Sequence, residues 1–334
     1  MRVGVVLVLL LGCLAAGAPQ GGPRWLLTLA WPGEIRSLAA TGGGEAWLLG
    51  RGGELRRWDG RAWGRAAVPA RPPGPYGMLV ASPAGDDLWL FGAGSPWQWA
   101  GGRWVGRPFP RGPFYDASYA VPARDRVWVG EMGGPEDCHC VGIRSWDGTR
   151  WVDLATGGAH TFDTQFALLA PPWVVNHRGP HRWDGTRLHP ASPPVTGCGS
   201  WEDYKVEHLA ARAGEAWVVA VSAPAVPTGS CAAGRRELLR WDGTAWIPVA
   251  PPPGLGGVSG LAVDGGGVWL AGGQTVFRWA KGREAKGRWV EGRWRVAVVP
   301  GGSGITRIVP EPGTGRLWVA ARDGTRTLVH LLSW

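Results

Sequence analysis

Short apolar runs, each bounded by turns rich in Gly and Pro, recur along the chain from about residue 24 to Trp334. Runs such as residues 46–49 and 88–91 are too short for a buried helix, and in each of them Trp is followed by Leu. Runs of this kind, separated by turn residues, are typical of strands in an all-β protein. No run reaches the ~18 apolar residues that a membrane-spanning helix needs, so we expect no transmembrane segment.

Trp residues mark a repeat within this pattern. Trp-Asp-Gly occurs four times, with one degenerate Trp-Ala-Gly copy, beginning at Trp58, Trp146, Trp183, Trp241 and Trp99. A large apolar residue follows each of them five positions later, at Trp63, Trp151, Leu188, Trp246 and Trp104. A further Trp precedes each unit and extends the series to seven copies, Trp47, Trp89, Trp128, Trp173, Trp217, Trp269 and Trp318.

Consecutive members of this series of seven Trp residues, from Trp47 to Trp318, are 39 to 52 residues apart. This period, with several short strands in each unit, is typical of propeller blades. We therefore predict an all-β fold, a seven-bladed β-propeller of four-stranded antiparallel blades. In the first unit the strands are expected at residues 35–39, around Trp47, up to Trp58 and over residues 63–68. The Asp-Gly pair predicts a tight hairpin before the fourth strand, because Gly adopts positive φ at no steric cost, and the Trp side chains are expected to stack blade against blade.

The two ends of the repeat fit together. The chain stops at Trp334, which aligns with Trp241, so the last unit lacks its fourth strand. Residues 22–27, including Trp25, have the pattern of a fourth strand that follows no unit. We expect this N-terminal strand to complete the last blade and leave no open sheet edge. The predicted organisation is a signal peptide and short leader at residues 1–20, followed by one domain at residues 21–334.

With these motifs the chain resembles bacterial exported β-propellers built from Trp-Asp-Gly repeats, similar in style to kelch, Asp-box and tryptophan-docking propellers. The resemblance covers nearly all of the predicted domain. Two motifs depart from it. Only Gly133-Gly134 and Gly272-Gly273 provide the double glycine of a kelch repeat, and the segment at residues 145–151 is one residue short of an Asp-box. The resemblance therefore implies the fold and no family's active site.

The first residues have the organisation of an export signal. A charged start at Arg2 precedes an apolar run at residues 3–14, and small residues follow at 15–18. This order is typical of a signal peptide. Alternatively, the Leu-Leu-Gly-Cys sequence ending at Cys13 resembles a bacterial lipobox and would leave that cysteine lipid-modified. We expect an exported protein, periplasmic or extracellular, either free or lipid-anchored.

Composition limits the partners. The 334 residues include 56 Gly, 29 Pro and 24 Trp, and 35 basic against 26 acidic residues give a formal charge of +9. The Gly and Pro content fits a turn-rich fold. Because the Arg residues are scattered through turns and the protein is expected to be exported, we predict no nucleic-acid binding. We expect this positive charge to favour binding to an anionic envelope polymer or membrane surface instead.

Loop lengths predict which face is used. A propeller exposes the loops between second and third strands, and those between blades, on one face. Between the Trp of the second strand and that of the third, units three and five have 18 and 24 residues, whereas unit four has 10. The rim of blades three to five is therefore the predicted working surface. A basic insertion at residues 280–293 in unit six lies on the opposite face.

Four cysteines fall on that rim. Cys198 and Cys231 belong to unit five, and an even number of cysteines in an exported protein favours a disulfide between them. Cys138 and Cys140 are separated by one residue, so a bond between them is strained. The alternatives for this pair are a disulfide, a redox pair or half of a metal site.

Histidines gather in the same region. His177 and His181 are expected in the short loop of unit four, and His160 with Asp163 near the start of its first strand. Imidazole and carboxylate groups bind zinc and other divalent ions, but this spacing matches no stringent motif, and solvated loop histidines are the commoner outcome. We predict no cofactor, with a divalent metal at the rim of blades three to five as the alternative.

The starts of the first strands line the mouth of the ring. Alignment places Asp116, Asp163 and Lys205 there in blades three to five, while the four equivalent positions are uncharged. These charged residues are either solvated strand ends or part of a polar ligand site. We predict a monomeric, non-catalytic binding or scaffold module for an envelope or extracellular protein or glycan. Its candidate ligand-binding residues are Asp116, His160, Asp163, His177, His181 and Lys205.

An enzyme is the competing hypothesis. The chain contains no G-x-S-x-G, H-E-x-x-H or phosphate-binding loop sequence. A glycan-directed lyase or hydrolase of the cell envelope, metal-assisted or not, would use Asp116, Asp163, His177 or His181 at the ring mouth.

Overall fold

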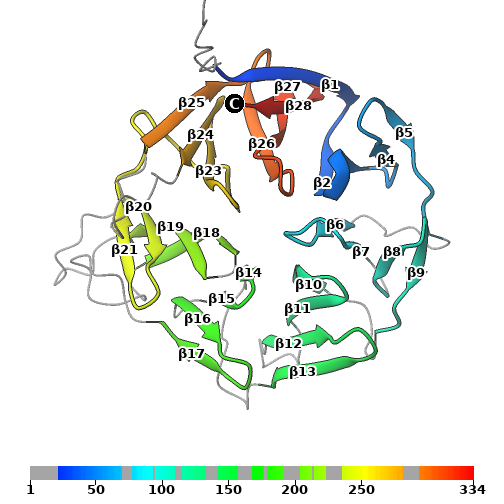
Figure 1. The fold of residues 1–334 in the computed structure, drawn as a ribbon, viewed down its shortest axis with the longest axis vertical. Coiled ribbons are helices and arrows are strands. Elements are labelled where there is room, and N and C mark those ends of the chain that lie inside the picture. The colour runs from blue at the N-terminus through cyan, green and yellow to red at the C-terminus, as the bar shows by residue number, and fades with distance from the viewer. Residues whose placement is uncertain are drawn as a thin grey trace, which may run out of the picture.

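The structure is a computed structural model that describes most of the chain after residue 21. The described residues are 22–69, 77–92, 95–109, 115–132, 141–156, 168–176, 179–191, 204–212, 214–222, 235–280 and 293–334. They form seven four-stranded antiparallel sheets arranged as blades around one axis (Figure 1). The predicted seven-bladed propeller is confirmed.

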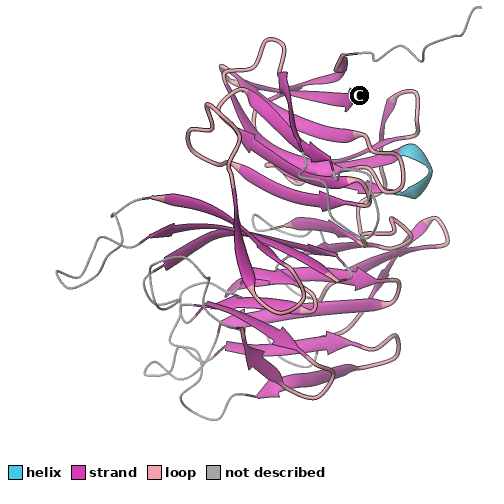
Figure 2. Cartoon of the chain, turned by 60° about the vertical axis from the view of Figure 1, so that its left-hand side comes forward, coloured by secondary structure: helices cyan, strands magenta, loops and turns pink. Residues whose placement is uncertain are grey.

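Strands follow chain order from the axis outward in the first six blades. The strands of blades one to three are β2 (Ile35–Thr41), β3 (Glu45–Gly50), β4 (Leu55–Trp58) and β5 (Trp63–Arg65); β6 (Met78–Ala81), β7 (Leu88–Phe91), β8 (Trp97–Ala100) and β9 (Arg103–Gly106); and β10 (Tyr115–Ala123), β11 (Arg126–Met132), β12 (Val141–Trp146) and β13 (Trp151–Thr156). A 3-10 turn, η1 (Gly42–Gly44), joins β2 to β3 and is the cyan element in Figure 2.

The other blades repeat this order. The strands of blades four to six are β14 (Leu168–Ala170), β15 (Trp173–Asn176), β16 (Gly179–Trp183) and β17 (Leu188–Pro190); β18 (Tyr204–Arg212), β19 (Glu215–Ser222), β20 (Arg236–Trp241) and β21 (Trp246–Val249); and β22 (Gly260–Asp264), β23 (Gly267–Gly272), β24 (Thr275–Ala280) and β25 (Arg293–Val298). Blade seven consists of β26 (Gly304–Pro310), β27 (Leu317–Asp323), β28 (Arg326–Ser333) and β1 (Arg24–Pro32).

The N-terminal strand closes the ring. β1 pairs antiparallel with β28, with Trp25 opposite Leu332 and Trp31 opposite Thr327. The last blade therefore contains three strands from the C-terminal end and one from the N-terminal end, as the sequence predicts. Closure leaves the propeller without an unpaired blade edge at the junction of its ends.

Tryptophan contacts hold each blade to the next. The Trp of the second strand packs against Trp residues of the third or fourth strand in the following blade, with ring centroids 4.8 to 6.5 Å apart. Going round the ring, the contacts are Trp47 with Trp99 and Trp104, Trp89 with Trp146, Trp128 with Trp183, Trp173 with Trp241 and Trp246, Trp217 with Trp279, Trp269 with Trp334, and Trp318 with Trp58 and Trp63. Most of these pairs meet edge to face, the arrangement that aromatic quadrupoles favour.

The Trp-Asp-Gly turns are wider than a two-residue hairpin. Trp58 pairs with Trp63, so four residues form the loop, and its first residue, Asp59, has a structural role. The Asp59 carboxylate accepts hydrogen bonds from the backbone N–H groups of Arg61 and Ala62 at 2.8 and 2.9 Å. Gly60 has a φ of +98°, which explains the glycine. The turns at Asp147, Asp184 and Asp242 repeat these bonds and add a Thr hydroxyl donor.

One element boundary differs from the sequence expectation. The fourth strand of blade one ends at Arg65 rather than Val68, because its partner β4 begins at Leu55 and offers no further residues to pair. Among the described residues, no helix is long and apolar enough to cross a membrane.

Replacement of Trp31 by Ala tests the closing strand. Trp31 is 7% exposed and packs in the cluster between blades seven and one, whereas Leu26 in the same strand is 53% exposed. We expect Trp31→Ala to lower the free energy of unfolding by about 3–5 kcal/mol and Leu26→Ala by less than about 1 kcal/mol, measured by urea denaturation. Equal effects of the two substitutions would contradict closure through β1.

The turn carboxylates predict an acid-dependent contribution to stability. Hydrogen bonds from the Arg150 backbone, then from the Thr149 hydroxyl and backbone, lower the pKa of Asp147 from 3.8 to about 2. A carboxyl whose pKa is lower in the folded state stabilises above its unfolded pKa and loses that effect as the pH falls through its folded pKa. We expect the melting-temperature difference between the wild type and Asp147→Asn to be constant above about pH 5 and to shrink between about pH 4 and pH 2. Asp242→Asn, in the equivalent turn, provides an independent repeat. A difference that stays constant down to pH 2 would contradict this assignment.

Candidate functional site

Two of the predicted ligand-binding residues lie at the ring mouth. Asp116 and Lys205 are the second residues of the innermost strands β10 and β18, and Lys205 is exposed. His160, Asp163 and His177 lie outside the described residues, as do Cys13, Cys138, Cys140, Cys198 and Cys231. Their predicted roles, disulfides and lipidation included, stay predictions.

His181 is not in the loop where the sequence places it. It lies in strand β16, paired with Val174 on one side and Pro190 on the other. Its Nδ1 is 3.0 Å from the carbonyl oxygen of Gly179, and the side chain is half-buried. β15 ends at Asn176 and β16 begins at Gly179, before His181. His181 therefore belongs to the third strand of blade four and not to the ring mouth.

Bulges reorganise the start of the innermost strands. The register of β2 with β3 shifts between Ile35 and Ser37, so that Arg36 is the inserted residue. The same shift makes Glu207 the inserted residue in β18 and Thr306 in β26. Bulges turn the strand and redirect side chains near the rims of closed sheets. Glu207 therefore has the position of Arg36 in blade five, and it accepts a hydrogen bond from Arg236 Nε at 2.9 Å.

Residues of blades seven and one enclose a hollow of about 500 Å³. It lies on what we call the connection face, the face formed by the links between blades, such as residues 33–34, and by turns between second and third strands, such as 51–54 and 324–325. Its lining includes Trp31, Glu34, Arg51, Glu54, Arg322 and Arg326. We call this feature the seam hollow.

One carboxylate organises the seam hollow. Glu34 accepts a hydrogen bond from Arg51 at 2.9 Å and another from Arg322 at 3.3 Å, and Arg326 pairs with Asp323 at 2.7 Å. The Arg51, Arg322 and Glu34 side chains are 71%, 57% and 54% exposed. Exposed ion pairs are worth little free energy, so these groups exchange partners easily. The lining contains three Arg and two Glu, and Asp323 pairs with one of these Arg, so the cluster carries three charges of each sign.

A second hollow follows the propeller axis. About 260 Å³ is enclosed by the innermost strands and the turns after them, largely by small apolar side chains. Arg212 and Asp264 add charge to its lining. Its residues come from blades one, two, five, six and seven, so the hollow belongs to the central channel.

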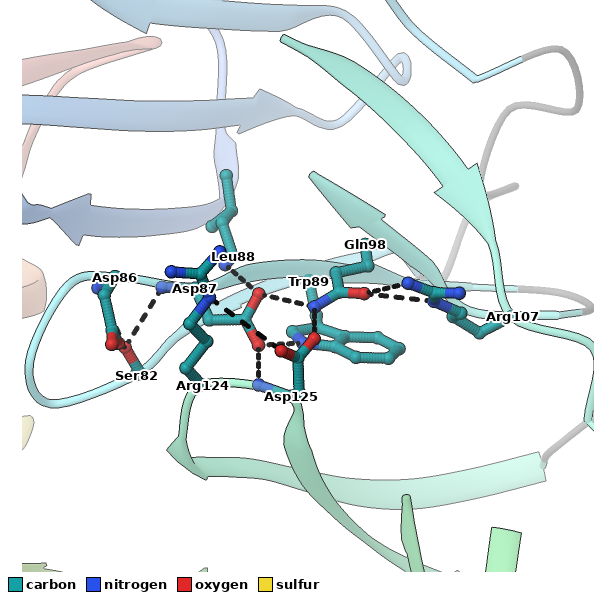
Figure 3. Close-up of polar contacts among 9 residues, drawn as sticks. All are labelled: Ser82, Asp86, Asp87, Leu88, Trp89, Gln98, Arg107, Arg124 and Asp125. Carbon is teal, nitrogen blue, oxygen red and sulfur yellow. Dashed lines mark hydrogen bonds and ion pairs between the residues drawn. The ribbon is translucent and has the colours of Figure 1, made fainter. Parts of the chain in front are cut away.

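The polar network shown in Figure 3 has a structural role in the propeller. The buried carboxylate of Asp87 accepts hydrogen bonds from Trp89 Nε1 at 2.8 Å, Gln98 Nε2 at 2.9 Å and the backbone N–H of Asp125 at 2.9 Å. Asp125 lies in the turn between β10 and β11, so this carboxylate ties blade two to blade three. Gln98 also accepts two hydrogen bonds from Arg107. The arrangement satisfies a buried charge and leaves little of it for a substrate.

Acidic side chains accept indole hydrogen bonds in two other blades. Glu215 accepts a hydrogen bond from Trp217 Nε1 at 3.0 Å, and Asp264 accepts one from Trp269 Nε1 at 2.7 Å. Among the residues that the structure describes, no group of three or more His, Cys, Asp or Glu side chains is placed to hold a metal ion.

Comparison with known proteins shows the fold. No protein-family model matches this chain, and no curated protein matches it. A solved structure described as YCF48 bound to D1 peptide is similar with a TM-score of 0.59 and 14% identity, covering 93% of this chain and 96% of that one. Virginiamycin B lyase from Staphylococcus aureus gives 0.54 and 12%, covering 93% and 99%, and the WD40 β-propeller domain of Doa1 gives 0.51 and 14%, covering 92% and 96%.

The sequence analysis did not identify the seam hollow. Its charged residues lie in short turns of blades one and seven, whereas loop length directs attention to blades three to five. The useful signal is closure itself, because the junction of the two chain ends brings residues 31–34 beside residues 322–327.

Replacement of Asp87 tests the interblade network. We expect Asp87→Ala to lower the free energy of unfolding by about 3 kcal/mol or more, because buried N–H donors on two blades lose their acceptor. Asp86→Ala is the matched control, since Asp86 is exposed and accepts one hydrogen bond, from the Ser82 hydroxyl. The control is expected to cost less than about 1 kcal/mol by chemical denaturation. An equal loss in both variants would show that Asp87 is not the interblade contact we describe.

Proposed function

We propose that the protein is an exported, non-catalytic propeller that binds a protein partner across its connection face. The seam hollow carries this proposal, because its Arg51 and Arg322 share one exposed carboxylate and are free to exchange it for acidic groups of a partner. The chain's formal charge of +9 favours an acidic partner further. The rim of blades three to five, with Asp116 and Lys205 at the ring mouth, completes the proposed surface.

The similar structures support a binding role by analogy. One of them is described as bound to a peptide, and another is a WD40 domain. The signal-like first residues place the proposed partner in the periplasm or outside the cell, with Cys13 as the alternative lipid anchor.

A lyase is the second candidate, because a lyase is among the proteins that share the fold. In that case Asp163 or His177 would act on a glycan at the ring mouth. Asp163→Ala and His177→Ala separate the two candidates: an enzyme loses turnover of envelope glycan, whereas a broad binding surface keeps its partner.

Site-specific photo-crosslinking in living cells tests the binding proposal. A photoreactive residue at position 54 or 325, both in the seam hollow, is expected to form a covalent adduct with a polypeptide, identified by mass spectrometry. Position 61, in the opposite turn of blade one, is the matched control.

Charge reversal makes this test specific. Arg51→Glu with Arg322→Glu is expected to reduce the adduct at least about tenfold, since charges of like sign repel across an interface. Equal crosslinking from position 61, or an adduct that survives charge reversal, would refute the proposal for this surface.

A further inference from the structure

Arg36 and Arg307 lie in strands on the two sides of the seam between blades one and seven. Arg36 is in β2 and Arg307 in β26, the innermost strands of these neighbouring blades (Figure 1). Both residues lie at the bulges near the start of these strands, at the mouth of the central channel. They lie nearer the axis than the residues that line the seam hollow.

Packing shows which segments of the two strands border the seam. Ile35 packs in the cluster between blades one and seven, and Arg36 follows it as the inserted residue of the bulge, where the alternation of sides along β2 is interrupted. Val309 packs in the same cluster, which places Arg307 on the side of β26 that faces β2.

The equivalent residue in blade one shows where Arg307 reaches. Ser37 has the position of Arg307 relative to the bulge, and its hydroxyl hydrogen-bonds to the Leu79 backbone of the next innermost strand. Arg307 is therefore directed across the seam toward β2.

Neither guanidinium has a partner among the described residues. The buried Nε of Arg36 makes no hydrogen bond, and no described acid pairs with Arg36 or Arg307. Other arginines on the connection face differ in this respect, since Arg51 and Arg322 pair with Glu34, Arg326 with Asp323 and Arg236 with Glu207. The two unpaired cations are thus an exception within their own surroundings.

The electrostatics of the pair are unfavourable without a ligand. Desolvation lowers the pKa of Arg307, and the positive charge of Arg36 lowers it further, although the Arg307 side chain is exposed. Two neighbouring cations repel each other, and this repulsion raises the free energy of the folded state. An anion between them removes that cost, and the planar guanidinium group pairs with two oxygens at once.

We propose that Arg36 and Arg307 form an oxyanion-binding site at the channel mouth, for a carboxylate or a phosphate group. The anion lies between blades one and seven and bridges the two guanidinium groups. It is either a free small molecule or a charged group of a larger ligand. This site does not require the seam hollow to bind a protein.

The first test measures the melting temperature of the full-length protein with malonate or inorganic phosphate, at an ionic strength held constant with sodium chloride. We expect either anion to raise the melting temperature of the wild type by about 2–4 °C at about ten times its dissociation constant. Arg36→Gln and Arg307→Gln are each expected to abolish the shift. Arg65→Gln, which changes an exposed arginine in an outermost strand, is the matched control and should keep it.

The variants are also informative without ligand. Because removal of one charge relieves repulsion, Arg36→Gln and Arg307→Gln are expected to melt at or above the wild-type temperature in anion-free buffer. Isothermal titration of the wild type with malonate measures the same site without any variant.

A second arm distinguishes the source of the anion. Titration with a hexaglutamate peptide is repeated on Arg36→Gln and on Arg51→Gln with Arg322→Gln. Binding of malonate or phosphate that is lost only in Arg36→Gln and Arg307→Gln supports a site for a free anion. Peptide binding that depends on Arg36 without any response to small anions supports a group carried by a larger ligand. If neither probe depends on Arg36 or Arg307, the site is refuted, whereas loss of crosslinking at the seam hollow alone would refute only the protein-binding proposal.

Discussion

The edge-to-face contact between a Trp of one blade and the Trp residues of the next is the interaction on which the propeller depends. A four-stranded blade cannot bury both of its faces alone, so it gains stability only from its neighbours. The second-strand Trp is almost completely buried at every blade, from Trp47 to Trp318, and it meets the third or fourth strand of the following blade each time. Since the contacts pass from Trp269 to Trp334 and from Trp318 to Trp58, they continue across the junction of the chain ends.

This arrangement also explains how the buried Asp87 and Asp264 and the half-buried Glu215 are used. Asp87, Glu215 and Asp264 each accept a hydrogen bond from the indole N–H of a second-strand Trp. Arg278 lies opposite Trp269 in the strand register, with its guanidinium 4.5 Å from the ring centroid, and pairs with Asp264. These carboxylates thus hold Trp side chains that pack against the next blade. The charges that stay available to a ligand lie at the strand starts and in the turns of the connection face.

The fold could be predicted because its main constraint, the packing of Trp between blades, depends on residue type. A buried Trp has few alternatives of equal size, so its spacing reveals the blades, and the missing fourth strand reveals the role of residues 24–32. Features set by pairing between strands could not be predicted. The short connection between β15 and β16 moves His181 from a loop into a strand. The bulges at Arg36 and Glu207 depend on the register with neighbouring strands, and a shift of one residue changes which side chain faces the channel.

The position of the two proposed sites follows from ring closure. Every seam is crossed by a chain that leaves the fourth strand of one blade and enters the first strand of the next, and β1 continues into β2 across the seam between blades seven and one. Blade seven is different, because its fourth strand comes from the N-terminal end and pairs with a C-terminal strand, β28. The seam beside it carries Glu34 between two arginines at the surface and the unpaired Arg36 and Arg307 nearer the axis. Repulsion between the cations of blades one and seven opposes ring closure. An anion bound by both blades would remove this repulsion and so stabilise the closed ring.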